Sequence, residues 1–139
     1  MRAKLTAMVV AISLFLILGA IPTWAHHSFA AEFDAKRPMN MKGTVTKLEW
    51  VNPHVWIHVD VKKPDGTVEN WAIEAGTPNT LYRRGITKDL LPIGTEIAIA
   101  GFGAKDGSRR ANGRDMKLAD GRSLFLGSSG TGAPSDQKK

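Results

Sequence analysis

The sequence predicts a small all-β protein, a barrel of five or six strands with one short helix. Three observations lead to this fold class. Apolar and polar residues alternate strictly over His54–Lys62, which is the period of a half-buried strand. Turn signals rich in glycine and proline separate several such short segments. The single helix start lies between the third and fourth of them, which is the order of an OB-like barrel. A β-sandwich fragment or an SH3-like barrel is the alternative.

The first 25 residues are expected to be a cleaved secretory signal peptide. Arg2 and Lys4 precede 17 uncharged residues, Leu5–Ile21, and small residues at positions 23 and 25 fit cleavage after Ala25. A membrane anchor is the competing interpretation. The apolar run is at the short limit of a bilayer span, and a cleavage site follows it directly, so no stable anchor is expected. A second cut, after Ala30, also fits the pattern.

Removing 25 of 139 residues leaves 114, enough for one small domain, with 17 basic and 13 acidic side chains and a net charge of +4. Such a mild charge is common on surfaces that bind nothing. The chain has no cysteine, which excludes disulfides, thiolate metal sites and a lipid anchor on cysteine. We therefore expect a periplasmic protein, and this compartment argues against a nucleic-acid partner.

Three regions are expected after the leader. Residues 26–40 form an extended N-terminal arm, residues 41–126 the OB-like barrel domain, and residues 127–139 a disordered tail rich in glycine and serine. The arm carries two aromatic residues, and we expect it to cover Trp56 through Phe29 or Phe33.

The first two strands are predicted on either side of a break. Pro38 discourages regular structure near the end of the arm, so the first strand is expected over Lys42–Trp50. Asn52-Pro53 ends it, and the second strand covers His54–Lys62.

The next turn predicts the strand register. Lys63-Pro64-Asp65-Gly66 fits a type I turn followed by a left-handed glycine, which is a three-residue hairpin loop. This loop pairs Val59 with Trp71 and Ile57 with Ile73, gathering apolar residues on one face, whereas a two-residue loop would split that face. The outer face then carries Trp56 opposite Glu74, His58 opposite Ala72, and Asp60 opposite Asn70.

A short helix is predicted after this hairpin. Thr77 fits its N-cap, Pro78 its first position and Gly85 its C-terminal end. Its apolar side is assigned to Leu81, Tyr82 and Ile86.

The last elements are short. A strand is predicted over Thr95–Phe102, followed by a polar, arginine-rich loop over residues 106–113. Met116 and Leu118 indicate another short strand, and Leu124–Leu126 closes the domain.

All four histidines lie between positions 26 and 58. After cleavage behind Ala25, the α-amine and imidazole Nδ1 of His26 can chelate one metal ion together, and His27 adds an adjacent imidazole. Nitrogen ligands of this kind favour copper, nickel or zinc. His54 and His58 lie on one strand face but about 13 Å apart, so at most one of them can join the N-terminal site.

Two interpretations of His54 stay open, a metal ligand or a hydrogen bond to a turn carbonyl. For His58 we favour a half-exposed strand residue beside Trp56. A carboxylate is expected near the metal site, drawn from Glu32, Asp34, Asp60 and Glu74.

The chain shows no nucleophile–base motif, zinc-protease motif or phosphate-binding glycine loop. Gly101-Phe102-Gly103 is interpreted as a bend at a strand end, because no helix is expected after it. A non-catalytic role is therefore the leading expectation.

The stretch His26–Asp34, which reads HHSFAAEFD, together with Gly43-Thr44-Val45 and Asn52-Pro53-His54, resembles a family of small secreted bacterial proteins of unknown function. The resemblance covers nearly the whole mature chain. It implies export and one compact β-rich domain, and it implies no activity. The histidine pair and the NPH motif are signature positions of that family, and its later glycines are comparable to Gly85, Gly94 and Gly101.

Three functional hypotheses follow. The first is a periplasmic binding protein that binds Cu(II) or another late transition metal through His26, with His27 or His54 as the added nitrogen ligand. The second is a metal-independent OB-fold module that binds a glycan or peptide on the outer face of the second and third strands. The third is a metal-dependent oxidative enzyme. The residues expected to bind the glycan or peptide in the second hypothesis are Trp56, His58 and Asn70.

Overall fold

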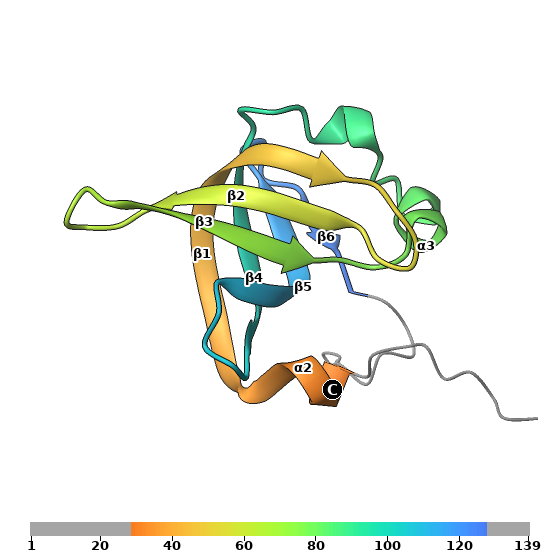
Figure 1. Ribbon diagram of the computed structural model, residues 1–139. Helices are drawn as coiled ribbons and strands as arrows, with labels where there is room; N and C mark the ends of the chain where they lie inside the picture. Colours follow the sequence, from red (N-terminus) through yellow and green to blue (C-terminus); the bar gives the residue numbers. More distant parts are fainter. Residues whose placement is uncertain (1–28, 128–139) are drawn as a thin grey trace, which may run out of the picture.

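The computed structural model describes residues 29–127. The expectations for the leader, for His26 and His27 and for residues 128–139 lie outside this range. Within it, no helix has the length and apolar character needed to cross a membrane. The elements in chain order are α2 (Phe29–Glu32), β1 (Phe33–Glu49), β2 (Trp56–Lys62), β3 (Val68–Glu74), α3 (Pro78–Arg83), the 3₁₀ turn η1 (Lys88–Leu90), β4 (Glu96–Ala104), β5 (Arg110–Leu118) and β6 (Ser123–Phe125) (Figure 1).

Five strands form a closed ring in the order β1-β2-β3-β5-β4, and β6 extends the sheet beside β5. Neighbouring strands are antiparallel except at one place, where Ala72–Glu74 of β3 runs parallel to Arg110–Asn112 of β5. The helix α3 connects β3 to β4, and apolar side chains from all five ring strands fill the interior. The predicted small all-β barrel of OB-like topology is confirmed.

The β2–β3 hairpin has the predicted register. Val59 pairs with Trp71 and Ile57 with Ile73. Gly66 has a φ of 88°, as the left-handed position of the loop requires. The two strands project beyond the barrel as a long ribbon (Figure 1).

The ends of α3 follow local sequence signals. Thr77 caps the N-terminus by accepting a backbone N–H at 3.2 Å. At the C-terminus, Gly85 with a φ of 77° donates to the Tyr82 carbonyl, and Ile86 donates to the Leu81 carbonyl, which together form a Schellman motif. Leu81 and Ile86 are buried, but Tyr82 is 71% exposed, so its predicted place on the apolar side is wrong. The helix therefore packs on the core through Leu81 and through Ile86, which follows its C-terminal cap.

The strand β1 is longer than predicted, because it begins at Phe33. Pro38 lies inside it, opposite Phe102 of β4. This half of β1 pairs only with β4, and β2 joins from Thr44 onward. Pro38 therefore lies on a free edge, where a missing N–H is tolerated.

The predicted polar loop over residues 106–113 is also shorter than expected, because β5 begins at Arg110. The small residues at the start of β5 give it no periodic hydrophobic pattern, but its close packing against β4 requires small residues. A Cβ added to Gly101 of β4 would lie 2.1 Å from the Asn112 carbonyl oxygen, so only glycine allows the two backbones to approach this closely.

The N-terminal segment packs on β4 and not on Trp56, which corrects the expected position of the arm. Phe29 and Phe33 form a second apolar cluster with Phe102 and Ala104, separate from the main core. The ring centroid of Phe29 lies 5.8 Å from that of Phe33 and 5.4 Å from that of Phe102. Phe102 thus provides the docking position that sequence reasoning assigned to the tryptophan.

We predict that Phe33→Ala lowers the free energy of unfolding by about 3–5 kcal/mol, because it removes a buried ring from this second cluster. Urea denaturation measures the loss. Phe125→Ala is the matched control, since Phe125 is 39% exposed and its guanidinium contact with Arg84 contributes about 1 kcal/mol or less. Equal losses in the two variants would show that the N-terminal segment is not packed on the barrel.

Candidate functional site

The place where β3 meets β5 brings polar side chains from several elements together. Trp56 of β2 lies opposite Glu74 of β3, and Glu74 lies opposite Asn112 of β5. These side chains point to the outer face of the barrel, because side chains alternate along a strand and the neighbouring Ile73 and Ala111 are in the core. We call the group the closure cluster; it consists of Glu32, His54, Trp56, Glu74, Arg110 and Asn112.

The centre of the closure cluster is a buried carboxylate–amide pair. Glu74 is 9% exposed and Asn112 is 5% exposed, and Asn112 Nδ2 donates to Glu74 Oε1 at 3.1 Å. Within residues 29–127, the buried Asn112 Oδ1 has no hydrogen-bond partner. Burial raises the pKa of Glu74, and this rise is partly offset by the charge of His54 and by the Asn112 hydrogen bond. The oxygen atoms of Glu74 and Asn112 are therefore acceptors that favour a hydrogen-bond donor or a cation as a ligand.

The orientation of His54 determines which of its nitrogens is available. His54 Nδ1 lies 3.0 Å from the carbonyl oxygen of Ala75. A carbonyl oxygen only accepts, so Nδ1 carries the hydrogen, and in the neutral ring the lone pair is on Nε2. This arrangement is typical of metal-ligating histidines, whose second ring nitrogen donates to a carbonyl or carboxylate. The turn-carbonyl bond considered for His54 is present, and it leaves Nε2 able to bind a metal.

A second set of contacts joins α2 to this region. Arg110 Nη2 forms an ion pair with Glu32 Oε2, and the Arg110 guanidinium lies 5.8 Å from the ring centroid of Trp56. The charge of Glu32 contributes to the raised pKa of Glu74, which indicates that the helix and the buried carboxylate are close. The start of the described chain is therefore held beside the closure cluster.

The predicted metal ligands are only partly within the described range. In residues 29–127 no group of three or more histidine or acidic side chains could hold a metal ion. His54 and Glu74 come together there, while His26 and His27 lie outside. Of the other carboxylates expected near the site, Asp34 instead accepts from a backbone N–H in its own turn.

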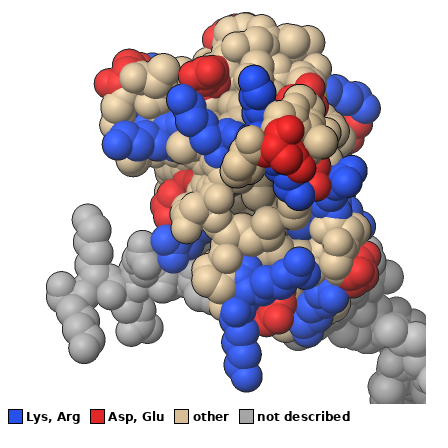
Figure 2. All heavy atoms as spheres, turned by 90° about the vertical axis from the view of Figure 1, so that its left-hand side faces the viewer, with Lys and Arg blue, Asp and Glu red and all other residues tan. Residues whose placement is uncertain are grey.

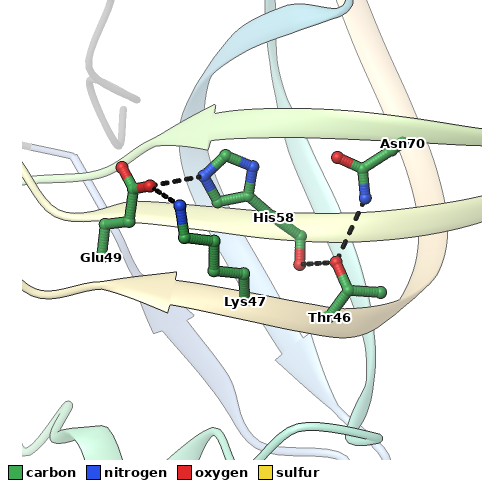
Figure 3. A network of polar contacts seen from close by, with 5 residues as sticks. All are labelled: Thr46, Lys47, Glu49, His58 and Asn70. Atoms are coloured by element: carbon green, nitrogen blue, oxygen red, sulfur yellow. Dashed lines mark hydrogen bonds and ion pairs between the residues drawn. The ribbon is translucent and has the colours of Figure 1, made fainter.

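The residues proposed for glycan or peptide binding share the outer face of β2 and β3, as their register predicts. Two of them, His58 and Asn70, are drawn in Figure 3 with the groups that they contact. His58 Nε2 lies 3.6 Å from Glu49 Oε1, and Asn70 Nδ2 donates to Thr46 Oγ1 at 3.1 Å. Trp56 is half-buried beside Arg110. Basic and acidic side chains are interspersed over the face in Figure 2, so that face presents no extended surface of one charge.

Sequence reasoning did not identify Asn112, and it interpreted Arg110 as a solvated charge of the arginine-rich loop in preference to an anion-binding group, because both residues fell in the predicted polar loop. A single asparagine in a stretch of small residues carries no periodic signal. The one available signal was the group of glycines at Gly101, Gly103 and Gly113. A Cβ at Gly101 would meet the Asn112 backbone, and a Cβ at Gly103 or Gly113 would meet the side chains packed against these strands.

Fold and site together define a small barrel protein of OB-like topology with a buried polar cluster where the barrel closes, a class that does not by itself specify an activity. The model of the Family of unknown function (DUF6152) matches residues 13–113, and the chain belongs to this family. The matched range includes the histidine pair and the NPH motif. No curated protein matches the chain, and no solved structure matches it.

We predict that Glu74→Gln stabilises the metal-free protein increasingly as the pH rises from about 4 to about 7. The folded-state pKa of Glu74 is raised, so its protonated form supports folding below the unfolded-state pKa, and this support is lost as the pH rises through the folded-state value. Thermal unfolding of both proteins over this range, with a chelator present, measures the difference. Glu96→Gln is the control, because Glu96 is exposed and paired with Lys42. A difference that is constant with pH would contradict the prediction.

Proposed function

We propose that the protein is exported to the periplasm and that, after cleavage behind Ala25, it binds one Cu(II) or another late transition-metal ion beside the closure cluster. The ligands are the α-amine and Nδ1 of His26, Nε2 of His54 and a carboxylate oxygen of Glu74, with His27 as an alternative nitrogen ligand. The observation that carries the proposal is the orientation of His54: its Nδ1 donates to the Ala75 carbonyl, which leaves the Nε2 lone pair for a ligand, and Glu74 lies close enough for the two side chains to interact electrostatically.

The length of chain between His26 and the barrel limits where the ligand atoms of His26 can lie. His26 precedes Phe29 by three residues, and three residues span about 10 Å when extended. Phe29 packs on Phe102, and Phe102 pairs with Asn112, the hydrogen-bond partner of Glu74. The contact of Phe29 with β4, the neighbour of the strand that carries Asn112, supports a site shared by the arm and the barrel.

The charges of the closure cluster support a cation. Glu32 is balanced by Arg110, whereas burial makes the charged form of Glu74 unfavourable. A metal ion supplies the missing positive charge, and imidazole, amine and carboxylate ligands together suit copper or zinc. The interaction module on the outer face of β2 and β3 remains a prediction: Asn70 donates to Asp60, and His58 Nε2 has a 3.6 Å contact with Glu49 but no hydrogen bond among the described residues.

We predict that protein recovered from the periplasm begins at His26. The small residues at positions 23 and 25, directly after the apolar run, set this expectation. Intact mass spectrometry measures the start. A mature chain that begins at Ala31 would lack both leading histidines and would contradict the metal site.

We predict that the processed protein binds one Cu(II) with nitrogen ligands, as read from its electron paramagnetic resonance spectrum. A variant with one extra residue ahead of His26 keeps every side chain but separates the α-amine from the imidazole chelate. Its copper affinity should fall at least tenfold, the scale of loss seen even when groups outside a metal's ligand shell are removed. Equal affinity of the two forms would contradict an N-terminal site.

The same measurement of copper affinity tests whether His54 of the barrel is a ligand. His54→Asn keeps a donor near the Nδ1 position for the Ala75 carbonyl and removes Nε2, so it should weaken copper binding at least tenfold. His58→Asn is the matched control, because His58 lies within β2, contacts Glu49 and is not part of the closure cluster, so the affinity should be unchanged. If His54→Asn binds copper as tightly as His58→Asn, the barrel contributes no histidine ligand.

A further inference from the structure

A groove on the outer face of the barrel shares no residue with the closure cluster. It has a volume of about 420 Å³ and is lined by residues of β1, β4, β5 and β6. Its floor consists of Ala98 and Ala100 on β4, which point outward because Ile99 between them is in the core. Two alanines between longer side chains of the neighbouring strands leave a hollow of the size that a small ligand needs.

The strand register places a lysine on each side of this floor. Lys42 of β1 lies opposite Ala98, and Ala98 lies opposite Lys117 of β5. The two lysines are therefore two strand spacings apart, about 10 Å between their Cα atoms, and both long side chains can reach one anion above Ala98. Lys42 is already paired with Glu96, at 3.3 Å, but both of these side chains are exposed. Exposed pairs contribute little to stability, so Lys42 is available to a ligand.

The next row of side chains supplies groups that bind hydroxyls. Asn40 and Asp115 lie on either side of Ala100, as the lysines do on either side of Ala98. The Asn40 amide both donates and accepts hydrogen bonds, and the Asp115 carboxylate accepts them. Hydroxyl groups match this combination, whereas a second anionic group would be repelled by Asp115.

The charges around the groove favour a ligand with a single negative charge. Lys42 is paired with Glu96, and Asp115 Oδ2 accepts from Arg114 Nε at 2.6 Å. Lys117 has no ion-pair partner among residues 29–127, so its charge is left uncompensated there. A carboxylate balances this one charge.

The main chain around the groove is already paired, which limits the kinds of ligand that fit. The strand β4 pairs with β1 on one side and with β5 on the other, and β5 also pairs with β6. An extended peptide therefore cannot add to the sheet here through backbone hydrogen bonds. Recognition depends on side chains alone, and these suit a carboxylate at one end of the ligand and hydroxyl groups at the other.

We propose that this groove binds an acidic sugar, with its carboxylate between Lys42 and Lys117 and its ring hydroxyls beside Asn40 and Asp115. The two rows are two residues apart along the strands, about 7 Å, so one sugar ring can contact both. Its C–H groups then lie on the alanine floor. This inference goes beyond the proposed function, since it needs no metal and uses no residue of the closure cluster.

Glucuronate is the probe, and two matched ligands separate its features. Its methyl ester keeps the ring hydroxyls but lacks the charge, and cyclohexanecarboxylate keeps the ring and the charge but lacks the hydroxyls. Each should bind about tenfold less tightly than glucuronate, because each loses hydrogen bonds that involve a charged group. Backbone amide shifts of the metal-free, processed protein measure the affinity, and the signals of Ala98 and Ala100 should move.

Two lysine variants test the position of the carboxylate. Lys117→Gln removes one charge-assisted contact and should lower the affinity for glucuronate about tenfold. Lys62→Gln, at an exposed lysine of the β2–β3 hairpin, is the matched control and should leave it unchanged. Both side chains are exposed, so both variants should fold as the wild type does.

The inference is overturned if glucuronate leaves the signals of Ala98 and Ala100 unmoved, or if Lys117→Gln and Lys62→Gln bind it equally well. Equal binding of the methyl ester would show that the lysines do not hold the carboxylate. Equal binding of cyclohexanecarboxylate would show that the groove selects an anion and not a sugar. Because the measurements are made without copper, none of these outcomes affects the proposed metal site.

Discussion

The short parallel pairing of β3 with β5 is the contact on which the rest of the molecule depends. It joins Ala72–Glu74 to Arg110–Asn112 and closes the sheet into a barrel. Close approach at this seam requires small residues, since a Cβ on Gly113 would lie 2.8 Å from a methyl group of Ile73. The same three-residue register places one side chain of each strand in the core and its neighbours on the outer face. The fold and the candidate site therefore share one structural cause.

The N-terminal segment changes the chemistry of that outer face. On most strands, a glutamate and an asparagine that face outward would be exposed to solvent. Here α2 is anchored by Phe29 on Phe102 and by the ion pair of Glu32 with Arg110, so it adds a carboxylate to the surroundings of Glu74. A segment that lies before the barrel in the chain thus becomes part of the environment of a residue in its wall. If the processed terminus supplies a metal ligand, maturation and site assembly are the same event.

Barrels of this topology commonly bind their ligands on the face of β2 and β3. In this protein, that face and the β3–β5 seam differ in how their polar side chains are paired. On the hairpin, Asn70 Nδ2 donates to Asp60 Oδ1 and to Thr46 Oγ1, and the second contact is drawn in Figure 3. His58 Nε2 has only its 3.6 Å contact with Glu49 and no hydrogen bond among the described residues. At the seam, by contrast, Asn112 Oδ1 and Arg110 Nε are buried and lack partners among residues 29–127. Buried polar groups without a hydrogen bond indicate where a ligand can bind, and at the barrel closure two of them lie two residues apart on one strand.

The sequence alone was sufficient wherever the signal is local. The hairpin register followed from the turn that ends at Gly66, and both ends of α3 followed from Thr77 and Gly85, because these residues act on a backbone only a few positions away. The sequence also named His54 and Glu74 as candidate ligands. Only the tertiary structure showed that these two side chains interact, and only it revealed the roles of Arg110 and Asn112, which lie 36 and 38 positions beyond Glu74. Pairing over such a separation depends on backbone approach and burial, which no local pattern of residues records.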